Sequence, residues 1–341
     1  MKFEPVPIED ASGKILGHNI YALGGRLVLS KGKALRHDDI LKLSGLGRRT
    51  VYVAEIEAGD VDESQAALRI ARAVAGKGIR LSRSAAGRVN LFASLPGILR
   101  CDVKRLEILN SFEGITLATL TGDRFVQFNQ TLATVKIIPF AVSGELLCRA
   151  EESVRGEFPL LGIDGLHSKK VALVLFGAEA AQERLRKSFE EPLRARLARY
   201  ASQVVVVEYL SLDDEKDEIN LSRTLVSLIS QGMELLILAG DTAVMDRGDI
   251  APRAIERAGG SIECVGVPVD PGNLLMLAYL GEAPILGAPG CARSLKTNAI
   301  DWVLPRLLAG EHLRRSDMAL LGHGGLLEDT SKRPMPRRRT A

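Results

Sequence analysis

VDPGNLLMLAYLGEAPILGAPGCARS, residues Val269 to Ser294, contains two apolar runs, and a Pro-Gly pair stands before the first run and after the second. The runs meet at Gly281-Glu282, which predicts an antiparallel pair of buried strands joined by a tight turn. The second Pro-Gly pair leads into small residues and then Arg293 and Ser294. We expect a helix from Arg293 to Gly310. The end of the second strand, a turn with only small side chains and the start of this helix would then follow directly on one another.

Upstream of this stretch, continuous Val, Ile and Leu runs alternate with helical patterns. The runs cover 171–176, 203–210, 234–240 and the segment ECVGVPV, and the helical patterns cover 178–200, 218–231 and 251–260. A strand that is buried on both faces reads as a continuous apolar run, so the alternation predicts an α/β domain with a mostly parallel sheet.

Residues 1–160 indicate a mixed, β-leaning α+β region. Its expected strands are RLVLSKG, TVYVAEI, ITLATL and TLATVKIIPFAV, and its expected helices are HDDILKLSGLG and Asp62–Gly76. A Gly-rich and Pro-containing segment, Arg155–Lys170, predicts a linker to the second domain.

Composition excludes several classes of protein. No apolar run reaches the roughly 18 residues that a membrane helix needs, and the first residues lack a signal-peptide apolar segment, so we expect a cytoplasmic protein. The four cysteines and five histidines show no paired-ligand spacing, which argues against a disulfide framework and a structural zinc site.

The net charge of +3 is concentrated at the end of the chain. Residues 331–341 contain five Lys and Arg and no acid, so the rest of the chain sums to 3 − 5 = −2. The nearly neutral body does not favour nucleic acid as a partner. We expect residues 316–341 to form a basic, disordered tail, with contact to RNA or an acidic partner as the alternative.

Ligands of parallel α/β sheets bind beyond the carboxyl ends of the strands, so the loops there are the candidate site. The first loop, AGDTAVMDRGDIAP, offers Gly240 for a sharp exit from the strand, Asp241 and Thr242 near its end, and Asp246 and Asp249 further along. The carboxylates are candidate catalytic groups that could hold Mg²⁺, with Asp249 as a metal ligand. The alternative is that Asp246 or Asp249 caps the next helix.

The second loop, PVDPGNLL, contains Asp270, Pro271, Gly272 and Asn273, which are candidate ligand contacts or a plain β-turn.

The third loop, GAPGCARSLKTN, offers Pro289, Gly290, Cys291, Arg293 and Ser294. Small residues there let backbone N–H groups converge at a helix start, where Arg293 and Ser294 could bind a phosphate. Cys291 is a candidate soft ligand, or a small buried filler.

Residues 168–312 resemble the molybdopterin-binding domain. The resemblance lies in two successive segments, LAGDTAVMDRGDIAPRAIERAGG and GVPVDPGNLLMLAYLGEAPILGAPG, and in the helix expected after them. Molybdenum insertases, molybdopterin adenylyltransferases and competence-damage-inducible-type proteins share that domain. The sequence VDPGN…LGAPGCARS is most similar to insertase-like regions that are sometimes fused to a molybdenum cofactor cytidylyltransferase. In the first half of the chain, GRVNLFA, GITLATLTGD and LATVKIIPFAV resemble the region that precedes the domain in those proteins. The resemblance implies a three-layer α/β fold that binds molybdopterin by its terminal phosphate at these loops.

The chain also departs from that family. Ala239-Gly240-Asp241 stands where a Thr/Ser-Gly-Gly signature is usual, and Asp270–Asn273 replaces a segment that usually carries lysines. No nucleotidyltransferase signature is present.

Three functions follow from the resemblance: an insertion or maturation step on molybdopterin or its nucleotide form, a non-catalytic carrier for a transferase or molybdoenzyme, and a nucleotide pyrophosphatase. By the same analogy we expect a homodimer.

Overall fold

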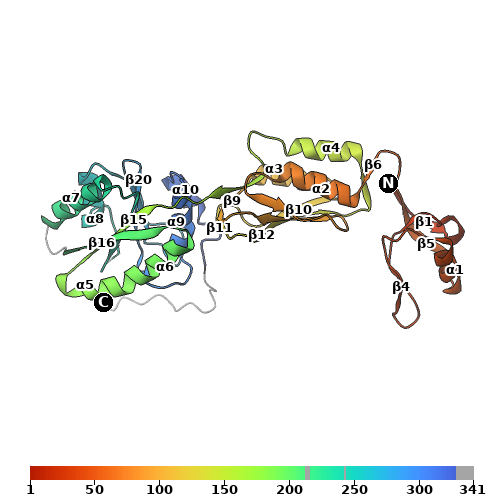
Figure 1. The fold of residues 1–341 in the computed structure, drawn as a ribbon, viewed down its shortest axis with the longest axis horizontal. Coiled ribbons are helices and arrows are strands. Elements are labelled where there is room, and N and C mark those ends of the chain that lie inside the picture. The colour runs from red at the N-terminus through yellow and green to blue at the C-terminus, as the bar shows by residue number, and fades with distance from the viewer. Residues whose placement is uncertain (212–215, 242, 328–341) are drawn as a thin grey trace, which may run out of the picture. The chain divides into compact units, whose positions relative to one another are not determined.

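The computed structural model describes residues 1–211, 216–241 and 243–327 (Figure 1). The chain divides into two units, Met1–Asp164 and Gly165–Ala341. Within the described residues, no helix combines the length and the apolar character needed to cross a membrane.

The first unit contains two separate apolar cores. One lies among residues between Val6 and Val53, under a three-stranded antiparallel sheet of order β1-β5-β2. The elements of this part are β1 (Lys2–Pro7), a 3-10 turn η1 (Ile8–Asp10), β2 (Ile15–Leu16), β3 (Ile20–Tyr21), β4 (Leu27–Leu29), α1 (His37–Gly45) and β5 (Thr50–Glu55).

The other core lies among residues between Ala66 and Ile163, where helix α2 packs on the sheet of order β10-β12-β8-β7. Asp62 caps α2 by accepting hydrogen bonds from the Ser64 and Gln65 N–H groups, as its acidic start predicts. The elements are β6 (Asp60–Asp62), α2 (Glu63–Val74), β7 (Ile79–Leu81), β8 (Arg88–Ala93), β9 (Gly97–Cys101), α3 (Val103–Asn110), β10 (Ile115–Thr119), β11 (Arg124–Val126), β12 (Thr131–Ile137), β13 (Ala141–Ser143), α4 (Gly144–Ser153) and β14 (Leu161–Gly165).

The second unit is built on one six-stranded sheet of order β16-β15-β17-β20-β19-β18. Neighbours from β16 to β20 are parallel, and β19 pairs antiparallel with both β20 and β18. The strands are β15 (Lys170–Gly177), β16 (Gln203–Ser211), β17 (Leu235–Gly240), β18 (Ser261–Val265), β19 (Met276–Leu280) and β20 (Ala283–Gly287). The mostly parallel sheet and the antiparallel pair turning at Gly281-Glu282 confirm the predicted α/β class.

Helices cover both faces of this sheet, which makes three layers (Figure 1). Ala172, Val174 and Phe176 of β15 share a core with α7 and α8. The alternate residues Val171 and Leu173 are equally buried against the opposite face, because successive side chains of a strand point to opposite sides. The helices are η2 (Glu179–Ala181), α5 (Gln182–Leu185), a π-helical turn η3 (Arg186–Glu190), α6 (Glu191–Arg199), α7 (Lys216–Ser230), α8 (Ile250–Arg257), a 3-10 turn η4 (Gly290–Arg293), α9 (Ile300–Leu308) and α10 (Arg315–Leu320).

Two expectations about the end of the chain are wrong. The helix expected to start at Arg293 begins at Ile300, and η4 and an irregular segment precede it. Residues 316–327, expected to lie in a tail, are folded, and α10 buries Met318. The backbone N–H of Asp270 donates to the Gly325 carbonyl, and the Asp270 carbonyl accepts from the Leu327 N–H. Apolar side chains and backbone pairing thus hold this segment on the second unit. Residues 328–341, the rest of the expected tail, lie outside the described residues.

Tyr279 of β19 forms hydrogen bonds to the segment that follows α9. Its buried hydroxyl accepts from the Leu313 N–H at 2.8 Å and donates to the Leu313 carbonyl at 3.1 Å. Burial raises the pKa of Tyr279 to about 12, so the hydroxyl keeps the proton that it donates. The His312 ring stacks on Tyr279 with centroids 4.0 Å apart.

Replacing Tyr279 with Phe should lower the free energy of unfolding of the second unit by about 1–3 kcal/mol, because it leaves the buried Leu313 N–H and C=O without their partner. Urea denaturation followed by circular dichroism measures the loss. The matched control is Tyr209→Phe, which should cost less, because the Tyr209 hydroxyl donates to the Ala178 carbonyl in an exposed hydrogen bond. An equal loss in both variants would contradict this role for Tyr279.

Candidate functional site

The three loops selected from the sequence all lie at one edge of the six-stranded sheet. Phe176 pairs with Gly240, and Leu238 pairs with Gly287, so β15, β17 and β20 end side by side. Met276 pairs with both Gly287 and Val265, which brings the loop between β18 and β19 to the same edge. The expected grouping of the loops is therefore a consequence of strand register.

The chain leaves this edge in opposite directions on the two sides of one crevice. After β15 it enters α5 and α6 on one face of the sheet, whereas after β17 it enters α8 on the other face (Figure 1). Such a reversal is where doubly wound α/β sheets bind their ligands. A hollow of about 170 Å³ lies at this crevice, and its walls are Phe176, Gly177, Ala243, Val244, Asp249, Ile250 and Ala251.

Two hydrogen-bonded carboxylates shape the loop that follows β17. Asp249 Oδ2 accepts from the N–H groups of Met245 (2.6 Å) and Asp246 (3.1 Å), and Asp246 Oδ1 accepts from the Gly248 N–H at 2.8 Å. Asp249 is the N-cap residue of α8, yet its side chain bonds backward into the loop instead of to the helix N–H groups.

Asp241, at the end of β17, pairs instead with Arg184 of α5, with 2.6 Å between Oδ1 and a guanidinium nitrogen. Within the described part of the chain, no three His, Cys, Asp or Glu side chains come together as a metal-binding group. Asp241, Asp246 and Asp249 therefore do not form such a group, and their catalytic role, with Asp249 as a Mg²⁺ ligand, stays a prediction. Thr242, a further predicted contact, lies outside the described residues.

Gly240 and Gly272 are glycines for reasons of packing. A Cβ on Gly240 would lie 2.3 Å from the Phe176 ring, which covers that strand end. Gly272 has a φ of +124°, and its Cβ would lie 2.5 Å from the Ala299 Cβ. The Ala299 N–H donates to the Pro271 carbonyl at 3.1 Å, so the turn from Asp270 to Asn273 packs directly against the residue before α9.

Gly290 differs from both of these glycines. It has no positive φ, and no heavy atom lies within 4 Å of the Cβ that a side chain would add. Its exposed backbone faces open space at the carboxyl edge of the sheet, so neither conformation nor packing requires glycine there.

The loop after β20 is held by Arg196 of α6, a residue that the sequence reasoning missed. Its side chain is fully buried. The guanidinium donates to the carbonyls of Ala292 (3.0 Å), Ser294 and Lys296 (3.0 Å), and its Nε lies 3.2 Å from Oδ1 of Asp301 in α9. One side chain thereby joins α6, the loop and α9.

A signal for Arg196 was present in the sequence. The buried side of this helix follows the helical spacing Phe189, Leu193, Leu197 and Tyr200, and Arg196 falls within that stripe. A cation on an apolar helix face requires buried acceptors, because an unpaired buried charge is very costly.

The geometry changes the interpretation of Arg293. The guanidinium carbon lies 4.7 Å from the centroid of the Phe189 ring, in the π-helical turn η3. Since α9 begins only at Ile300, no α-helix dipole acts at Arg293, and the cation is held by the aromatic face. The α9 start carries Asp301, and the Ile300 N–H donates to Asn298 Oδ1, as in an ordinary structural helix start.

Cys291 and Ser294 flank this arginine. Burial raises the pKa of the Cys291 thiol, which favours the neutral, poorly coordinating form. Ser294 is exposed, and its Oγ accepts from the Lys296 N–H at 3.2 Å.

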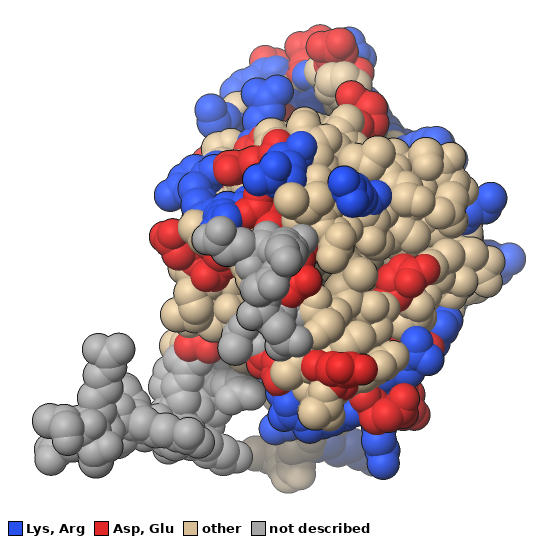
Figure 2. Space-filling view, turned by 90° about the vertical axis from the view of Figure 1, so that its left-hand side faces the viewer, with Lys and Arg blue, Asp and Glu red and all other residues tan. Residues whose placement is uncertain are grey.

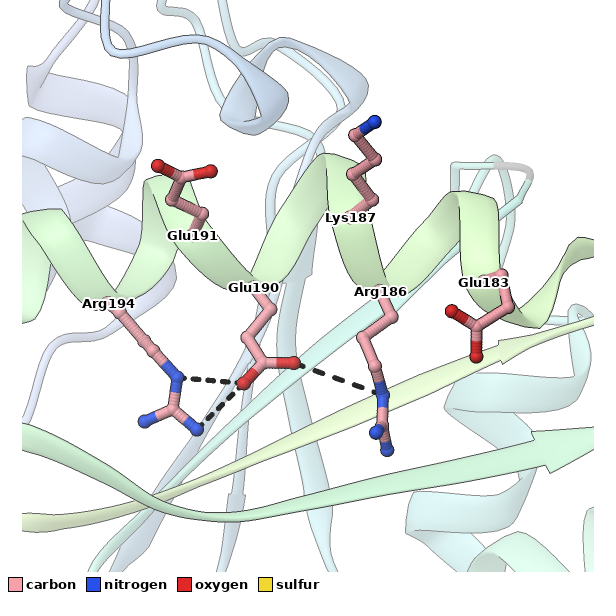
Figure 3. A pocket seen from close by; sticks show the side chains of 6 residues that line it. All are labelled: Glu183, Arg186, Lys187, Glu190, Glu191 and Arg194. Carbon is pink, nitrogen blue, oxygen red and sulfur yellow. Dashed lines mark hydrogen bonds and ion pairs between the residues drawn. The ribbon is translucent and has the colours of Figure 1, made fainter.

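A larger hollow, of about 350 Å³, lies elsewhere, along the outer side of the helix from Glu183 to Arg194 (Figure 3). Figure 3 shows Glu190 bonded to Arg186 and Arg194, while Lys187 and Glu191 point to the other side of the helix. One helix supplies all of its lining, and the three acidic and three basic side chains of that lining balance in charge. The hollow at the strand ends is therefore the better candidate site.

Comparison with family models matches one short segment of the chain. A family model described as a domain of unknown function (DUF8806) matches residues 5–55. No curated protein matches the sequence.

Three of the solved structures that are similar to this chain are described here by their names. A molybdenum cofactor biosynthesis protein from Pyrococcus furiosus shares 13% identity with a TM-score of 0.25, covering 93% of this chain and 65% of that chain, slightly less than two thirds of its length. A molybdopterin biosynthesis moeA protein from Pyrococcus horikoshii shares 10% identity with a TM-score of 0.27, covering 93% and 75%. A molybdopterin biosynthesis protein from Mycobacterium abscessus shares 13% identity with a TM-score of 0.28, covering 41% and 92%.

Gly272→Ala and Gly290→Ala form a matched pair. The first should lower the free energy of unfolding by at least about 2 kcal/mol, because overpacking costs roughly 1–3 kcal/mol and a positive φ costs alanine roughly 1–2 kcal/mol more. The second should stay within about 0.5 kcal/mol of the parent protein, as for other exposed positions. Denaturant titration compares them. A large loss at Gly290, or none at Gly272, would contradict the packing described here.

Proposed function

We propose that the second unit binds molybdopterin, or its nucleotide form, at the carboxyl edge of its sheet, and that the protein acts in molybdenum cofactor biosynthesis. The observation that carries this proposal is the hollow between the ends of β15 and β17, at the reversal of chain direction. The resemblance of residues 168–312 to the molybdopterin-binding domain supports it, because the residues of that resemblance line this edge.

The hollow suits one part of such a ligand. Its volume of about 170 Å³ is below the roughly 300–1,000 Å³ of a complete small-molecule pocket. A pterin ring has flat faces that can pack against Phe176, Val244 and Ile250, and its polar groups lie around its edge. The remainder of the ligand would then extend along the strand ends toward the loop after β20.

Asp249 is the residue that we assign to recognition of the ring. Its Oδ2 is occupied by two backbone N–H groups, whereas Oδ1 accepts no hydrogen bond from any described residue. A pterin presents a 2-amino group and a ring N–H on one edge, and both are donors that a carboxylate oxygen can accept.

The surface around the site is also suitable. Figure 2 shows the side of the molecule toward which β15 runs in Figure 1, and uncharged residues form a broad area there with charged side chains mainly around it.

A carrier function is the second candidate, and one observation favours it. Asp241, Asp246 and Asp249 each use a carboxylate oxygen for a protein donor, and the three are not grouped as metal ligands among the described residues. Release of AMP from adenylated molybdopterin with Mg²⁺ and molybdate would assign an insertion step. Binding without turnover would assign a carrier, which delivers the cofactor to a transferase or a molybdoenzyme.

Filling the hollow tests the site. Ala243→Trp should weaken binding of molybdopterin at least about tenfold, which corresponds to about 1.4 kcal/mol, because the indole occupies the space proposed for the ring. The matched control is Ala198→Trp on the exposed side of α6, which should bind like the parent protein. Anaerobic titration calorimetry measures both. Absence of binding by the parent protein, or equal affinity in the two variants, would remove the proposed site.

A further inference from the structure

The buried guanidinium of Arg196 fixes the direction of alternate peptide groups in the loop after β20. The carbonyls of Ala292, Ser294 and Lys296 all point to this one side chain. These residues are alternate members of a five-residue segment, and the segment therefore presents one side to Arg196.

Peptide planarity then determines what the other side presents. In a trans peptide the C=O of one residue and the N–H of the next point in opposite directions. The N–H groups of Arg293, Leu295 and Thr297 consequently point away from the guanidinium. Those of Leu295 and Thr297 donate to no acceptor among the described residues, and residues 293–297 are all exposed.

The side chains on this segment add charge of the appropriate sign. Arg293 and Lys296 are exposed cations, and Ser294 and Thr297 are exposed hydroxyls. Outward N–H groups, cations and hydroxyls are the donors that bind a phosphate monoester. These donors do not belong to a helix N-terminus, because α9 begins at Ile300 and the Ile300 N–H donates to Asn298 Oδ1.

We propose that Arg293–Thr297 is an anion-binding segment for a phosphate monoester and that Arg196 is its positioning residue. The inference rests on the proposed function in one respect, because the monoester is taken to be the terminal phosphate of the bound pterin. It differs from the phosphate position expected from the sequence, which was the turn from Pro289 to Ser294. Arg196 touches the loop and not the ligand, so its contribution passes through the direction of the peptide groups.

Lysine cannot replace arginine in this arrangement. A guanidinium offers five donors in a planar fork, whereas an ammonium is a compact charge with three donors on a flexible stem. One ammonium cannot reach three carbonyls and the Asp301 carboxylate from the same position. Arg196→Lys should therefore keep the buried charge but release part of the loop.

The test compares two probes, the fluorescent oxidised pterin derived from molybdopterin with its phosphate and the same pterin after phosphatase treatment. Fluorescence titration gives the ratio of the two dissociation constants for each variant. In the parent protein the phosphorylated pterin should bind at least tenfold more tightly. Arg196→Lys should reduce that preference at least fivefold and leave the affinity for the dephosphorylated pterin unchanged. Arg199→Lys, on the exposed side of the same helix, is the matched control and should keep the parent preference.

Asp301→Asn is a second variant, and it should change the preference for the phosphorylated pterin in the opposite direction to Arg196→Lys. It removes the carboxylate charge beside Arg196, so the segment becomes more positive. Its one amide oxygen can replace Oδ1, which accepts from Arg196 Nε, but not Oδ2, which accepts from the Asn298 N–H. The preference for the phosphorylated pterin should then rise about two- to fivefold. This variant decides the question if Arg196→Lys does not fold.

The outcomes separate the inference from the proposed function. Failure of the parent protein to bind either pterin removes the proposed function. Binding of both pterins with no preference for the phosphate, or an unchanged preference in Arg196→Lys, overturns the anion-binding segment and leaves the pterin site in place. A reduced preference in Asp301→Asn also overturns it.

Discussion

The hydrogen bonds of the buried Arg196 guanidinium are the constraint on which the carboxyl edge of the second unit depends. Removing one partner from a buried charge commonly costs about 3–5 kcal/mol, so the loop after β20 cannot move away without a large loss of stability. Asp301 ties the start of α9 to the same group, and Ala299, before that start, packs on the turn at Gly272. The third loop, the second loop and two helices are therefore fixed through one side chain.

The topology of the sheet creates the hollow, to which Arg196 does not contribute. Since β15 and β17 are neighbours whose connections leave on opposite faces, the space between their ends is not covered by either helix. Phe176 and Gly177 form one wall, and the loop shaped by Asp249 forms the other. A hollow lined partly by apolar side chains and a segment rich in hydrogen-bond donors thus lie at one edge of the sheet.

The sequence predicted those parts of the fold that depend on burial. Val171–Phe176 and Leu235–Gly240 are apolar throughout, and only a strand covered on both faces has that pattern. It failed where tertiary contacts decide local structure. A helix at Arg293 was compatible with the residues, but the carbonyls of Ala292, Ser294 and Lys296 are bound to Arg196 and cannot form helical hydrogen bonds. Nor could spacing along the chain show that Asp241 pairs with Arg184, or that Phe189 lies beneath Arg293.

Hydrogen exchange of the Leu295 and Thr297 amides, followed at residue resolution, shows whether these two N–H groups bind the phosphate. With the phosphorylated oxidised pterin bound, both amides should exchange more slowly, because the phosphate accepts their hydrogen bonds. The dephosphorylated pterin should slow exchange around Ala243–Ala251 alone. Equal exchange at Leu295 and Thr297 with both pterins, or slowing confined to other parts of the chain, would contradict the account.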